Sequence, residues 1–492
     1  MLPDFLSDFR LSIFLVLFVI VIRKLQKFLN LRKIGDDLPG PPASLLTGNV
    51  LEIEPAGGMG PFLRNLHETY GPVVRYWVGP SELNVSINDP EILEQLDIIN
   101  TERPTSFIQF MKEIFNENSL FYLSGRAGKE RRSIYHKVFA KRPYENIMPQ
   151  FGKIIDELGS KWLSQRNGDK SVTIDVQNEA QPLWAKLNEY NVFGDRCNSE
   201  SNLTKNFSDL FELLLKIRFS FYPLVPYTKL WYKKYALLDC VHSEVSRLIR
   251  EELKRREESN SAAKTDLLSL LLEDEELTEE TVYAEVMTLL FATFDNFTGL
   301  SFVMHKFAEL KDVQEKIRNE VQHVWGDNSP TKLDDLTRLV YTRAAIKEAL
   351  RHGGSGNSNF RLLTQDYLIQ NKYFIPKGTC IVTPVRLLHK NPSQWENPDK
   401  FDPERFMSFD KEHPEESSKR SRLAYIPFGF GPRSCLGQRY AIDTLTLTIG
   451  LLTRRFDIDA VRKGNEITWK ETIFSDQAVG GLWLKCTPRG AE

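Results

Sequence analysis

The segment at residues 428–437 reads FGFGPRSCLG, and its pattern is the most specific in the chain. Pro432 restricts one backbone dihedral angle and stiffens the turn that this segment predicts. The residues that follow Cys435, QRYAIDTLTLTIGLLTRRF, place apolar side chains at helical spacing. Cys435 should therefore stand just before a helix, on a turn whose glycines permit positive φ or a close backbone approach: Gly429, Gly431 and Gly437.

A cysteine in this position could act as a thiolate ligand to an iron ion. The start of a helix supplies amide donors and a partial positive charge, and both help to keep a sulfur deprotonated. A tight turn lets the sulfur approach a flat macrocycle, while Phe428 could shield it from water. Arg433 could pair with a carboxylate of the bound group. The alternative is an ordinary glycine-rich turn, since a free cysteine is usually a small buried residue.

The segment also resembles the cytochrome P450 signature FxxGxRxCxG, which fits at every fixed position: Phe428, Gly431, Arg433, Cys435 and Gly437. The resemblance extends through most of the chain from Leu38 onward. It implies haem b (iron protoporphyrin IX) as the cofactor, with the Cys435 thiolate as axial ligand to the metal. It also implies a mainly α fold with a minor β part, in a single large cytochrome P450 domain.

Two further segments resemble the family's structural triad of one glutamate and two arginines. Residues 346–351 read IKEALR, in which Glu348 and Arg351 share one face of a helix. By itself such a pair is usually a surface salt bridge of little energetic value. Residues 401–406 read FDPERF and supply the third member, Arg405. The resemblance implies a buried network that supports the cysteine turn and takes no part in catalysis.

Two other arginines are similar to those that bind the haem propionates in this family. Arg361 starts the segment RLLTQD, ten residues after Arg351. Arg132 ends the segment GRAGKERR, at a place where the family usually has WxxxR. Gly128 stands at the position of the tryptophan, so one stacking or hydrogen-bonding partner of the cofactor is lost.

The segment ATFDNF, residues 292–297, resembles the family's oxygen-activating pattern [AG]GxDT[ST] with two departures. Asp295 is retained, Thr293 replaces the glycine that makes room above the iron, and Asn296 replaces the threonine. The resemblance makes Asp295 and Asn296 the candidate catalytic residues. An amide can donate and accept hydrogen bonds, so a water network can survive the exchange. Proton delivery should be poorer, because an amide is not a competent acid.

The N-terminal part of the chain should attach the protein to a membrane. Residues 11–22 read LSIFLVLFVIVI, and such a run reaches about 18 Å as a helix, against ~30 Å of bilayer hydrocarbon. We predict an uncleaved anchor with a basic flank at residues 1–37; a removed signal peptide and a buried core helix are the alternatives. The cations after the run place the catalytic domain, residues 38–492, on the cytosolic side of the endoplasmic reticulum membrane. The segment LPGPP at residues 38–42 should join the two parts.

Composition excludes several other classes of function. The net charge of −2 lacks the basic excess of nucleic-acid-binding proteins, so we expect no nucleic-acid partner. The five cysteines are widely spaced and include no CxxC pair, which argues against a disulfide framework and against a cysteine-rich zinc site. Phosphate-loop, dinucleotide, nucleophile-elbow and HExxH motifs are absent from the sequence.

The remainder of the chain indicates many helices and few strands. Apolar residues at helical spacing predict helices at residues 154–162, 210–217, 236–256 and 281–310. Short β-rich runs predict strands at residues 73–79, 373–384 and 467–469. An apolar substrate pocket should be lined by residues 105–115, 207–224 and 291–298.

The leading hypothesis is a membrane-bound monooxygenase that inserts one oxygen atom of O₂ into an apolar substrate such as a lipid, a sterol or a xenobiotic. Electrons would come from NADPH through NADPH-cytochrome P450 reductase, with cytochrome b5 as a second candidate donor. The donor would dock on a basic face, although scattered surface charge is the alternative reading of its residues: Lys129, Arg131, Lys137, Lys141, Arg142 and Arg439.

Two other functions remain open at this stage. Thr293 and Asn296 favour an isomerase or dehydratase that rearranges a hydroperoxide or endoperoxide, because such family members need neither O₂ nor the threonine. A haem-binding protein with little catalysis is the third possibility. The divergent segment at 292–297, with NLHETYGPVVRYWVG at 65–79, further resembles the animal orphan family numbered twenty.

Overall fold

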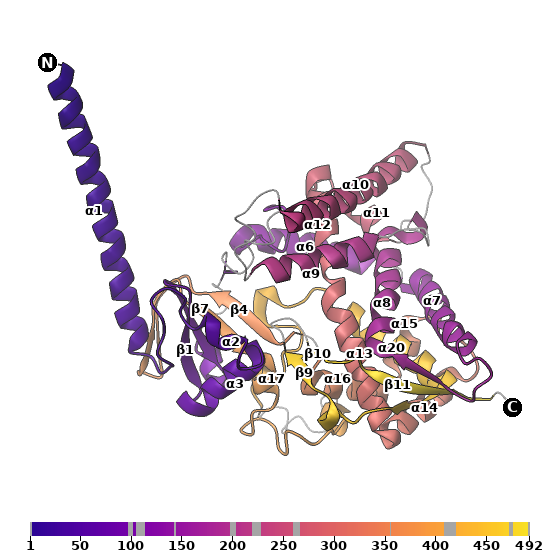
Figure 1. The fold of residues 1–492 in the computed structure, drawn as a ribbon. Helices are drawn as coiled ribbons and strands as arrows, with labels where there is room; N and C mark the ends of the chain where they lie inside the picture. Colours follow the sequence, from indigo (N-terminus) through magenta and orange to yellow (C-terminus); the bar gives the residue numbers. More distant parts are fainter. Residues whose placement is uncertain are drawn as a thin grey trace. The chain divides into compact units, whose positions relative to one another are not determined.

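The structure is a computed structural model that describes residues 2–96, 102–104, 114–141, 144–196, 203–218, 228–258, 266–354, 356–407, 420–471 and 476–490. At residues 2–17, 140–141, 144–146, 215–218 and 293–296 it describes the backbone alone. The chain forms two compact units, drawn as ribbons in Figure 1. Unit 1 comprises Met1–Glu102 and Asn359–Leu388, and unit 2 comprises Arg103–Ser358 and His389–Glu492. The division predicted at residue 38 stays a prediction.

Unit 1 is built on a sheet in which the strands follow the order β1-β2-β7-β4. Strand β2 pairs antiparallel with β1 and parallel with β7. Helix α3 packs its apolar face, which includes Phe62 and Leu66, against the residues Val74, Tyr76 and Val382 of the sheet. The elements of this unit are α1 (Leu2–Asp36), α2 (Val50–Ile53), α3 (Met59–Tyr70), β1 (Val73–Val78), β2 (Glu82–Ile87), α4 (Pro90–Glu94), β4 (Ser358–Leu362), β5 (Tyr367–Ile369), β6 (Tyr373–Ile375), β7 (Cys380–Pro384) and α17 (Val385–His389).

Helix α1 contains the apolar run for which an anchor is predicted. Within the part of the chain that the structure describes, no helix has both the length and the apolar composition needed to cross a membrane. The anchor and its membrane location stay predictions. The proline-rich segment after α1 lies along β1, because the Arg75 N–H donates to the Pro39 carbonyl at 2.7 Å and the Arg75 guanidinium contacts the Pro41 carbonyl.

Unit 2 is mainly helical, and its core lies around α20 (Gln438–Arg455), in which every residue from Tyr440 to Thr453 is buried. Helices α7 (Tyr144–Ser164), α14 (Lys311–Trp325) and α16 (Val340–His352) pack against α20. The other described helices are α6 (Gly125–Lys141), α8 (Val176–Phe193), α9 (Leu203–Arg218), α10 (Lys229–Glu258), α11 (Leu267–Leu271), α12 (Glu279–Phe291), α13 (Thr293–Glu309), α15 (Leu333–Thr337) and α18 (Glu404–Met407).

Two small antiparallel sheets complete unit 2, one with the order β3-β11-β8 and one formed by β9 and β10. Their strands are β3 (Val172–Asp175), β8 (Phe456–Ala460), β9 (Trp469–Glu471), β10 (Asp476–Ala478) and β11 (Trp483–Pro488). The strand predicted at 467–469 is therefore displaced toward the C-terminus and begins at Trp469. The 3₁₀ turn Gly464–Glu466, which precedes it, uses backbone hydrogen bonds that a longer strand would need.

Two predicted elements are each interrupted in the structure. The helix predicted at 281–310 is two helices, α12 and α13, because Ala292 between them has a ψ of −14° while its φ of −59° remains helical. The strand predicted at 373–384 is likewise two strands, β6 and β7, with Gly378 between them at a φ of +84°. Helices α7, α9 and α10 contain the segments predicted for them, and β1 and α20 each end one residue before the end of theirs.

The packing of α20 predicts the effect of adding one methyl group. A Cβ at Gly450 would lie 2.4 Å from the Trp325 ring, which is buried and held by its donation to the Asp335 carbonyl at 2.9 Å. Gly450→Ala should lower the free energy of unfolding by ~1–3 kcal/mol through overpacking, measured by urea titration. Gly152→Ala in α7 is the control, since its Cβ would meet only Leu451 Cδ1 at 4.0 Å. It should be neutral or stabilising by up to ~1 kcal/mol, and equal losses in both variants would contradict the prediction.

Candidate active site at the cysteine turn

The turn that carries Cys435 is closed by backbone hydrogen bonds. The Cys435 N–H donates to the Phe428 carbonyl at 2.8 Å, and the Gly429 N–H donates to the Ile426 carbonyl at 2.9 Å. Gly429 and Gly431 have φ values of +71° and +66°, so both need glycine. Gly437 differs, because its φ is −83° and an added Cβ would meet Cys435 Sγ at an ordinary 3.8 Å. Of the three glycines for which positive φ or a close backbone approach is predicted, only Gly429 and Gly431 adopt a positive φ.

Cys435 lies exposed, shortly before the first residue of α20, Gln438. Among the described residues, no group of three or more His, Cys, Asp or Glu side chains is arranged to hold a metal ion. Phe428 is half-buried and packs against the main hydrophobic core.

Two of the predicted propionate arginines contact the cysteine turn or belong to it. Arg132 of α6 donates from Nη1 to the Ser434 carbonyl at 3.0 Å. Burial lowers the pKa of Arg132, whereas the nearby Cys435 sulfur raises this pKa by a smaller amount. Arg433 donates from Nη2 to Ser124 Oγ at 2.6 Å and from Nη1 to the Leu120 carbonyl at 3.3 Å. Sequence reasoning missed Ser124, because no motif marks a serine that contacts a residue so far along the chain.

Arg361 belongs to unit 1, where it lies on β4. Its side chain is buried and donates from Nη1 to the carbonyl of its own neighbour, Phe360, at 2.8 Å. Its predicted contact with a haem propionate stays a prediction.

Gly128, which stands where the family usually has a tryptophan, is closely surrounded by other atoms. A Cβ at Gly128 would lie 3.0 Å from the Leu123 carbonyl oxygen and 3.5 Å from Arg433 Nη2. Gly128 is itself buried in α6. In this backbone, position 128 cannot hold a large side chain without displacing the segment to which Arg433 is bonded.

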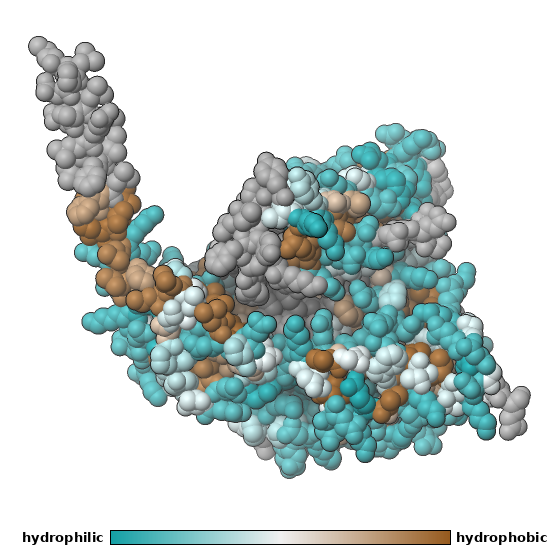
Figure 2. All heavy atoms as spheres, viewed as in Figure 1, coloured by the Kyte–Doolittle hydropathy of each residue, from teal (hydrophilic) through white to brown (hydrophobic). Residues whose placement is uncertain are grey.

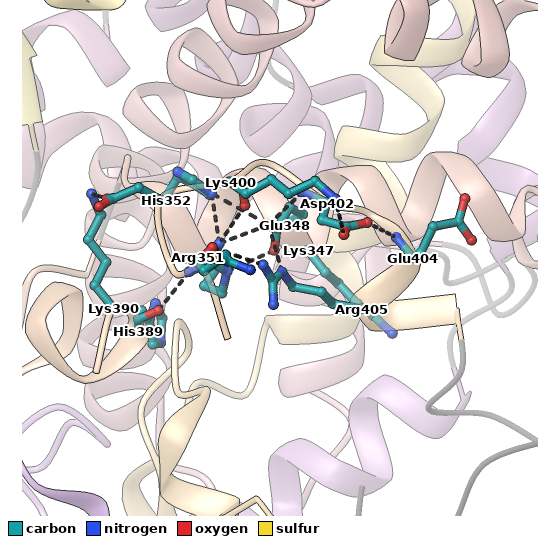
Figure 3. A network of polar contacts seen from close by, with 12 residues as sticks. Lys347, Glu348, Arg351, His352, His389, Lys390, Lys400, Asp402, Glu404 and Arg405 are labelled. Carbon is teal, nitrogen blue, oxygen red and sulfur yellow. Dashed lines mark hydrogen bonds and ion pairs between the residues drawn. The ribbon is translucent and has the colours of Figure 1, made fainter. Parts of the chain in front are cut away.

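The Glu348–Arg351 pair predicted from IKEALR lies fully buried on α16 (Figure 3). Arg351 donates from Nε to Glu348 Oε2 and from Nη2 to Glu348 Oε1, both at 2.8 Å. Arg405 completes the triad, with its Nε 3.5 Å from Glu348 Oε1. The Asp402 N–H donates to the same Glu348 oxygen at 2.8 Å. The carboxylate is thus surrounded by donors, as a buried charge requires.

A chain of hydrogen bonds joins this triad to the cysteine turn. Arg351 Nη1 donates to the His389 carbonyl at 2.8 Å, and His389 Nε2 accepts the Ile426 N–H at 2.9 Å. Ile426 in turn accepts the Gly429 N–H within the turn. Tyr425 stacks on His389 with ring centroids 5.2 Å apart, and its hydroxyl donates to the Lys347 carbonyl at 2.9 Å. His389 and Tyr425 were not predicted as site residues from the sequence, since no motif assigns a role to either side chain.

The pKa of Glu348 reflects its donors. Burial alone raises it, but the hydrogen bonds from Arg351 and His352 outweigh burial and bring it below the ordinary value of 4.5. The carboxylate therefore remains ionised in the core at neutral pH.

Asp295 and Asn296 lie in the first turn of α13, directly after the break at Ala292. Their side chains lie outside the described part of the structure. Nearby, Phe291 ends α12 and packs edge-on against three aromatic rings at centroid distances of 5.1 to 5.2 Å: Phe115, Phe121 and Phe211. Phe115, Phe211 and Phe291 come from the three predicted pocket segments, although residues 105–113 and 219–227 are not described. These rings supply an apolar wall beside the start of α13.

The predicted basic docking face requires one correction. Arg131 is not a surface cation, because its guanidinium contacts the fully buried carboxylate of Glu285 on α12. Glu285 also accepts from the Tyr135 hydroxyl and the Leu120 N–H, each at 2.9 Å, and burial raises its pKa against these donors. Lys129, Lys137 and Arg439 are exposed, whereas the side chains of Lys141 and Arg142 are not described.

Known proteins resemble this chain over most of its length. The family model described as cytochrome P450 matches residues 38–478. Cytochrome P450 4F5 of Rattus norvegicus is 28% identical over 458 residues, covering 86% of this chain and 84% of the relative. The ultra-long-chain fatty acid omega-hydroxylase of Homo sapiens is 27% identical over 456 residues, covering 87% and 82%.

A solved structure shows a similar fold. The retinoic acid bound cyanobacterial CYP120A1 has a TM-score of 0.76 with 21% sequence identity, covering 92% of this chain and 99% of that chain. The prediction of a mainly helical fold of this type, with a minor β part, is confirmed.

The buried triad predicts a large effect from a small change. Glu348→Gln leaves the Arg351 charge buried with a weaker partner, so the free energy of unfolding should fall by ~3–5 kcal/mol. Because the folded-state pKa of Glu348 is lowered, its contribution is full above pH 4.5 and is lost as the pH falls through the folded-state value. The variant should therefore show a shallower loss of stability below pH 4.5 than the wild type.

Urea titrations between pH 3 and 7 measure both effects, with the exposed Glu315→Gln as a control expected within ~0.5 kcal/mol of wild type. An unchanged pH profile in Glu348→Gln would contradict this account.

The close contacts around Gly128 predict that a side chain added at this position, beside Arg433, impairs retention of the haem. Gly128→Ala should push the Leu123 carbonyl and Arg433 apart, at a cost of ~1–2 kcal/mol. We expect haem transfer to an apo-globin acceptor to become roughly five-fold faster or more. Ser133→Ala, at an exposed position of α6, is the control and should leave the rate unchanged. Slower haem loss from Gly128→Ala would show that the space at position 128 is not needed.

Proposed function

The chain belongs to the cytochrome P450 family, and from this premise we propose that it is a haem-thiolate monooxygenase that inserts one oxygen atom of O₂ into an apolar substrate. The observation that carries the proposal is the exposed thiol of Cys435 on a hydrogen-bonded turn, tied through Ile426 and His389 to the buried Glu348–Arg351 pair. A cysteine that would hold an iron cofactor needs a fixed position. A turn tied to a buried ion pair meets that need.

The predicted metal ligand, the propionate arginines and the triad each have a role in this proposal. Cys435 would be the axial ligand, and the bound haem would supply O₂ activation, which a thiolate ligand favours. Arg132 and Arg433 would hold one propionate side of the macrocycle through charge-assisted hydrogen bonds, with Arg361 as a further partner. Glu348, Arg351 and Arg405 would keep the turn in place.

Asp295 and Asn296 would position water at the start of α13. The carboxylate of Asp295 can accept a proton from solvent and pass it on, and the amide of Asn296 can orient a water but cannot release a proton. The aromatic wall of Phe115, Phe121, Phe211 and Phe291 would exclude bulk water and accept an apolar ligand. Because one relative is named an ultra-long-chain fatty acid omega-hydroxylase, long acyl chains are the substrate class to test first.

The redox partner and location follow from the same proposal. NADPH-cytochrome P450 reductase would supply electrons, with cytochrome b5 as a second donor, at a docking face that retains Lys129, Lys137 and Arg439 but not Arg131. The endoplasmic reticulum membrane would hold residues 1–37, with the catalytic domain in the cytosol. Membership of the animal orphan family numbered twenty is a narrower prediction that the sequence similarities reported above do not address.

One alternative has a specific observation in its favour. Asn296 and Thr293 replace the threonine and glycine of the oxygen-activating pattern, which suits an isomerase or dehydratase acting on a hydroperoxide or endoperoxide. That reaction would need neither O₂ nor NADPH. A protein that binds haem with little catalysis is the remaining possibility.

A single comparison separates these functions. Purified holoprotein with reductase and NADPH would be incubated with long-chain fatty acids, beside the same protein given lipid hydroperoxides without NADPH. We expect NADPH-dependent hydroxylated product. Turnover of the hydroperoxide without NADPH would favour the isomerase or dehydratase. The absence of product in both incubations would contradict the proposal that the protein is a monooxygenase and would leave a haem-binding protein with little catalysis.

Cys435→Ser serves as the control for the cofactor. It should abolish the thiolate-type Soret band of the reduced, carbon-monoxide-treated protein together with product formation. An intact band in this variant would contradict the assignment of Cys435.

A further inference from the structure

A fully buried carboxylate lies at the start of strand β10. Hydrophilic residues cover most of the face drawn in Figure 2, whereas Asp476 is fully inaccessible, which is rare for a charged side chain without partners. Its Oδ2 accepts the Gly354 N–H at 3.1 Å, and its Oδ1 accepts from Asn357 Nδ2 at 2.8 Å. Its own N–H donates to the Gly354 carbonyl at 3.0 Å. Such a carboxylate holds its partners closely, because each lost bond would leave a buried polar group unsatisfied.

The partners of Asp476 belong to a glycine-rich stretch that follows α16. Residues 353–357 read GGSGN, and we call them the glycine segment. Gly354 is buried and has a φ of +114°, a conformation that favours glycine. Glycine has no side chain to pack and loses much conformational freedom when its backbone is fixed. The glycine segment therefore depends on hydrogen bonds for its position, and Asp476 makes them with two of its residues.

The glycine segment lies against helix α13. A Cβ on Gly354 would be 3.4 Å from Gly299 Cα and 3.4 Å from Phe302 Cβ, so there is little room for a side chain between the two backbones. Phe302 also packs on the Trp469 ring of β9 at a centroid distance of 5.6 Å, and β9 pairs with β10. Figure 1 shows β9 and β10 beside α13. Asp476 thus bonds the glycine segment to a strand pair that itself contacts α13.

The same segment reaches the entrance to the cysteine turn two residues later. Gly356 has a φ of +75°, and a Cβ there would lie 3.0 Å from the Pro427 carbonyl oxygen. Pro427 directly precedes Phe428, whose carbonyl accepts the Cys435 N–H at 2.8 Å. Because two residues of chain span at most ~7 Å, the glycine segment limits the distance between α13 and the cysteine turn.

We propose that Asp476 is a positioning residue for the cofactor. By fastening the glycine segment, it keeps α13 and the cysteine turn at the separation that a bound macrocycle requires. In the proposed function Cys435 would bind the iron, and Asp295 and Asn296 would position water one helical turn before Gly299. The inference rests on the haem within the proposed function, but not on the reaction that the haem would support.

Asp476→Asn tests the bonds of the carboxylate at nearly constant side-chain volume. An amide has one acceptor and one donor, so its donor must face either the Gly354 N–H or Asn357 Nδ2, and one hydrogen bond is lost. Haem transfer from the full-length holoprotein to an apo-globin acceptor should become roughly five-fold faster or more. Adding Asn357→Asp places an acceptor opposite the amide donor, so the double variant should recover most of the wild-type rate.

Asp175→Asn is the matched control, because Asp175 makes the same kinds of bonds at the end of β3. It accepts from Asn178 Nδ2 at 2.8 Å and from the Leu482 N–H at 2.9 Å. These bonds do not involve the glycine segment or the cysteine turn. The substitution should therefore lower the urea midpoint of unfolding without speeding haem transfer, which separates a loss of stability from an effect on the cofactor.

The outcomes separate this inference from the proposed function. If Asp476→Asn loses haem no faster than Asp175→Asn, or if the double variant stays as fast as the single one, the inference is overturned. If Asp476→Asn does not fold, Asn357→Ala removes one donor and keeps both bonds to Gly354, and a smaller acceleration is expected. A wild-type protein without a Soret band would overturn the cofactor and the inference together. All measurements omit NADPH and substrate, so a failure of the monooxygenase proposal cannot mimic them.

Discussion

A buried ion pair, Glu348 with Arg351, is the interaction on which the candidate site depends. Both side chains are fully inaccessible, and the hydrogen bonds that they make with each other and with neighbouring residues offset the cost of removing two charges from water. Arg351 uses its remaining donor to hold the His389 carbonyl, and His389 holds Ile426 at the entrance to the cysteine turn. The position of Cys435 is thereby tied to the buried core of unit 2 and not only to its own loop.

Two neighbouring arginines of α6 show how burial decides the use of a charge. Arg131 and Arg132 project about 100° apart around the helix axis. Arg131 meets Glu285, a carboxylate that burial would otherwise neutralise, and forms part of the packing between α6 and α12. Arg132 contacts the backbone beside Cys435 and stays partly accessible. One cation therefore stabilises the fold while the other remains suited to bind an anionic cofactor group.

In unit 1 a buried arginine has a different task. Arg32 donates to backbone carbonyls of two turns and stacks on Trp77, so the end of α1 is fastened to the first sheet. The proline-rich segment that follows α1 is held along β1 in the same way, through Arg75. The segment at residues 38–42, which is predicted to join the anchor to the catalytic domain, is thus itself bonded to β1.

Features that lie within short, continuous segments could be predicted from the order of the residues alone. The pattern around Cys435, the start of α20, the pairing of Glu348 with Arg351 and the mainly helical fold all depend on residues within one turn or one helix of each other. The tertiary structure alone decided the break at Ala292, the division of residues 373–384 into two strands, the burial of Arg131 and the contact of Arg433 with Ser124. The burial of Arg131 and the contact of Arg433 with Ser124 depend on partners far apart in the chain, and the energy of such a contact is set by packing and by access of water, which spacing along the sequence does not encode.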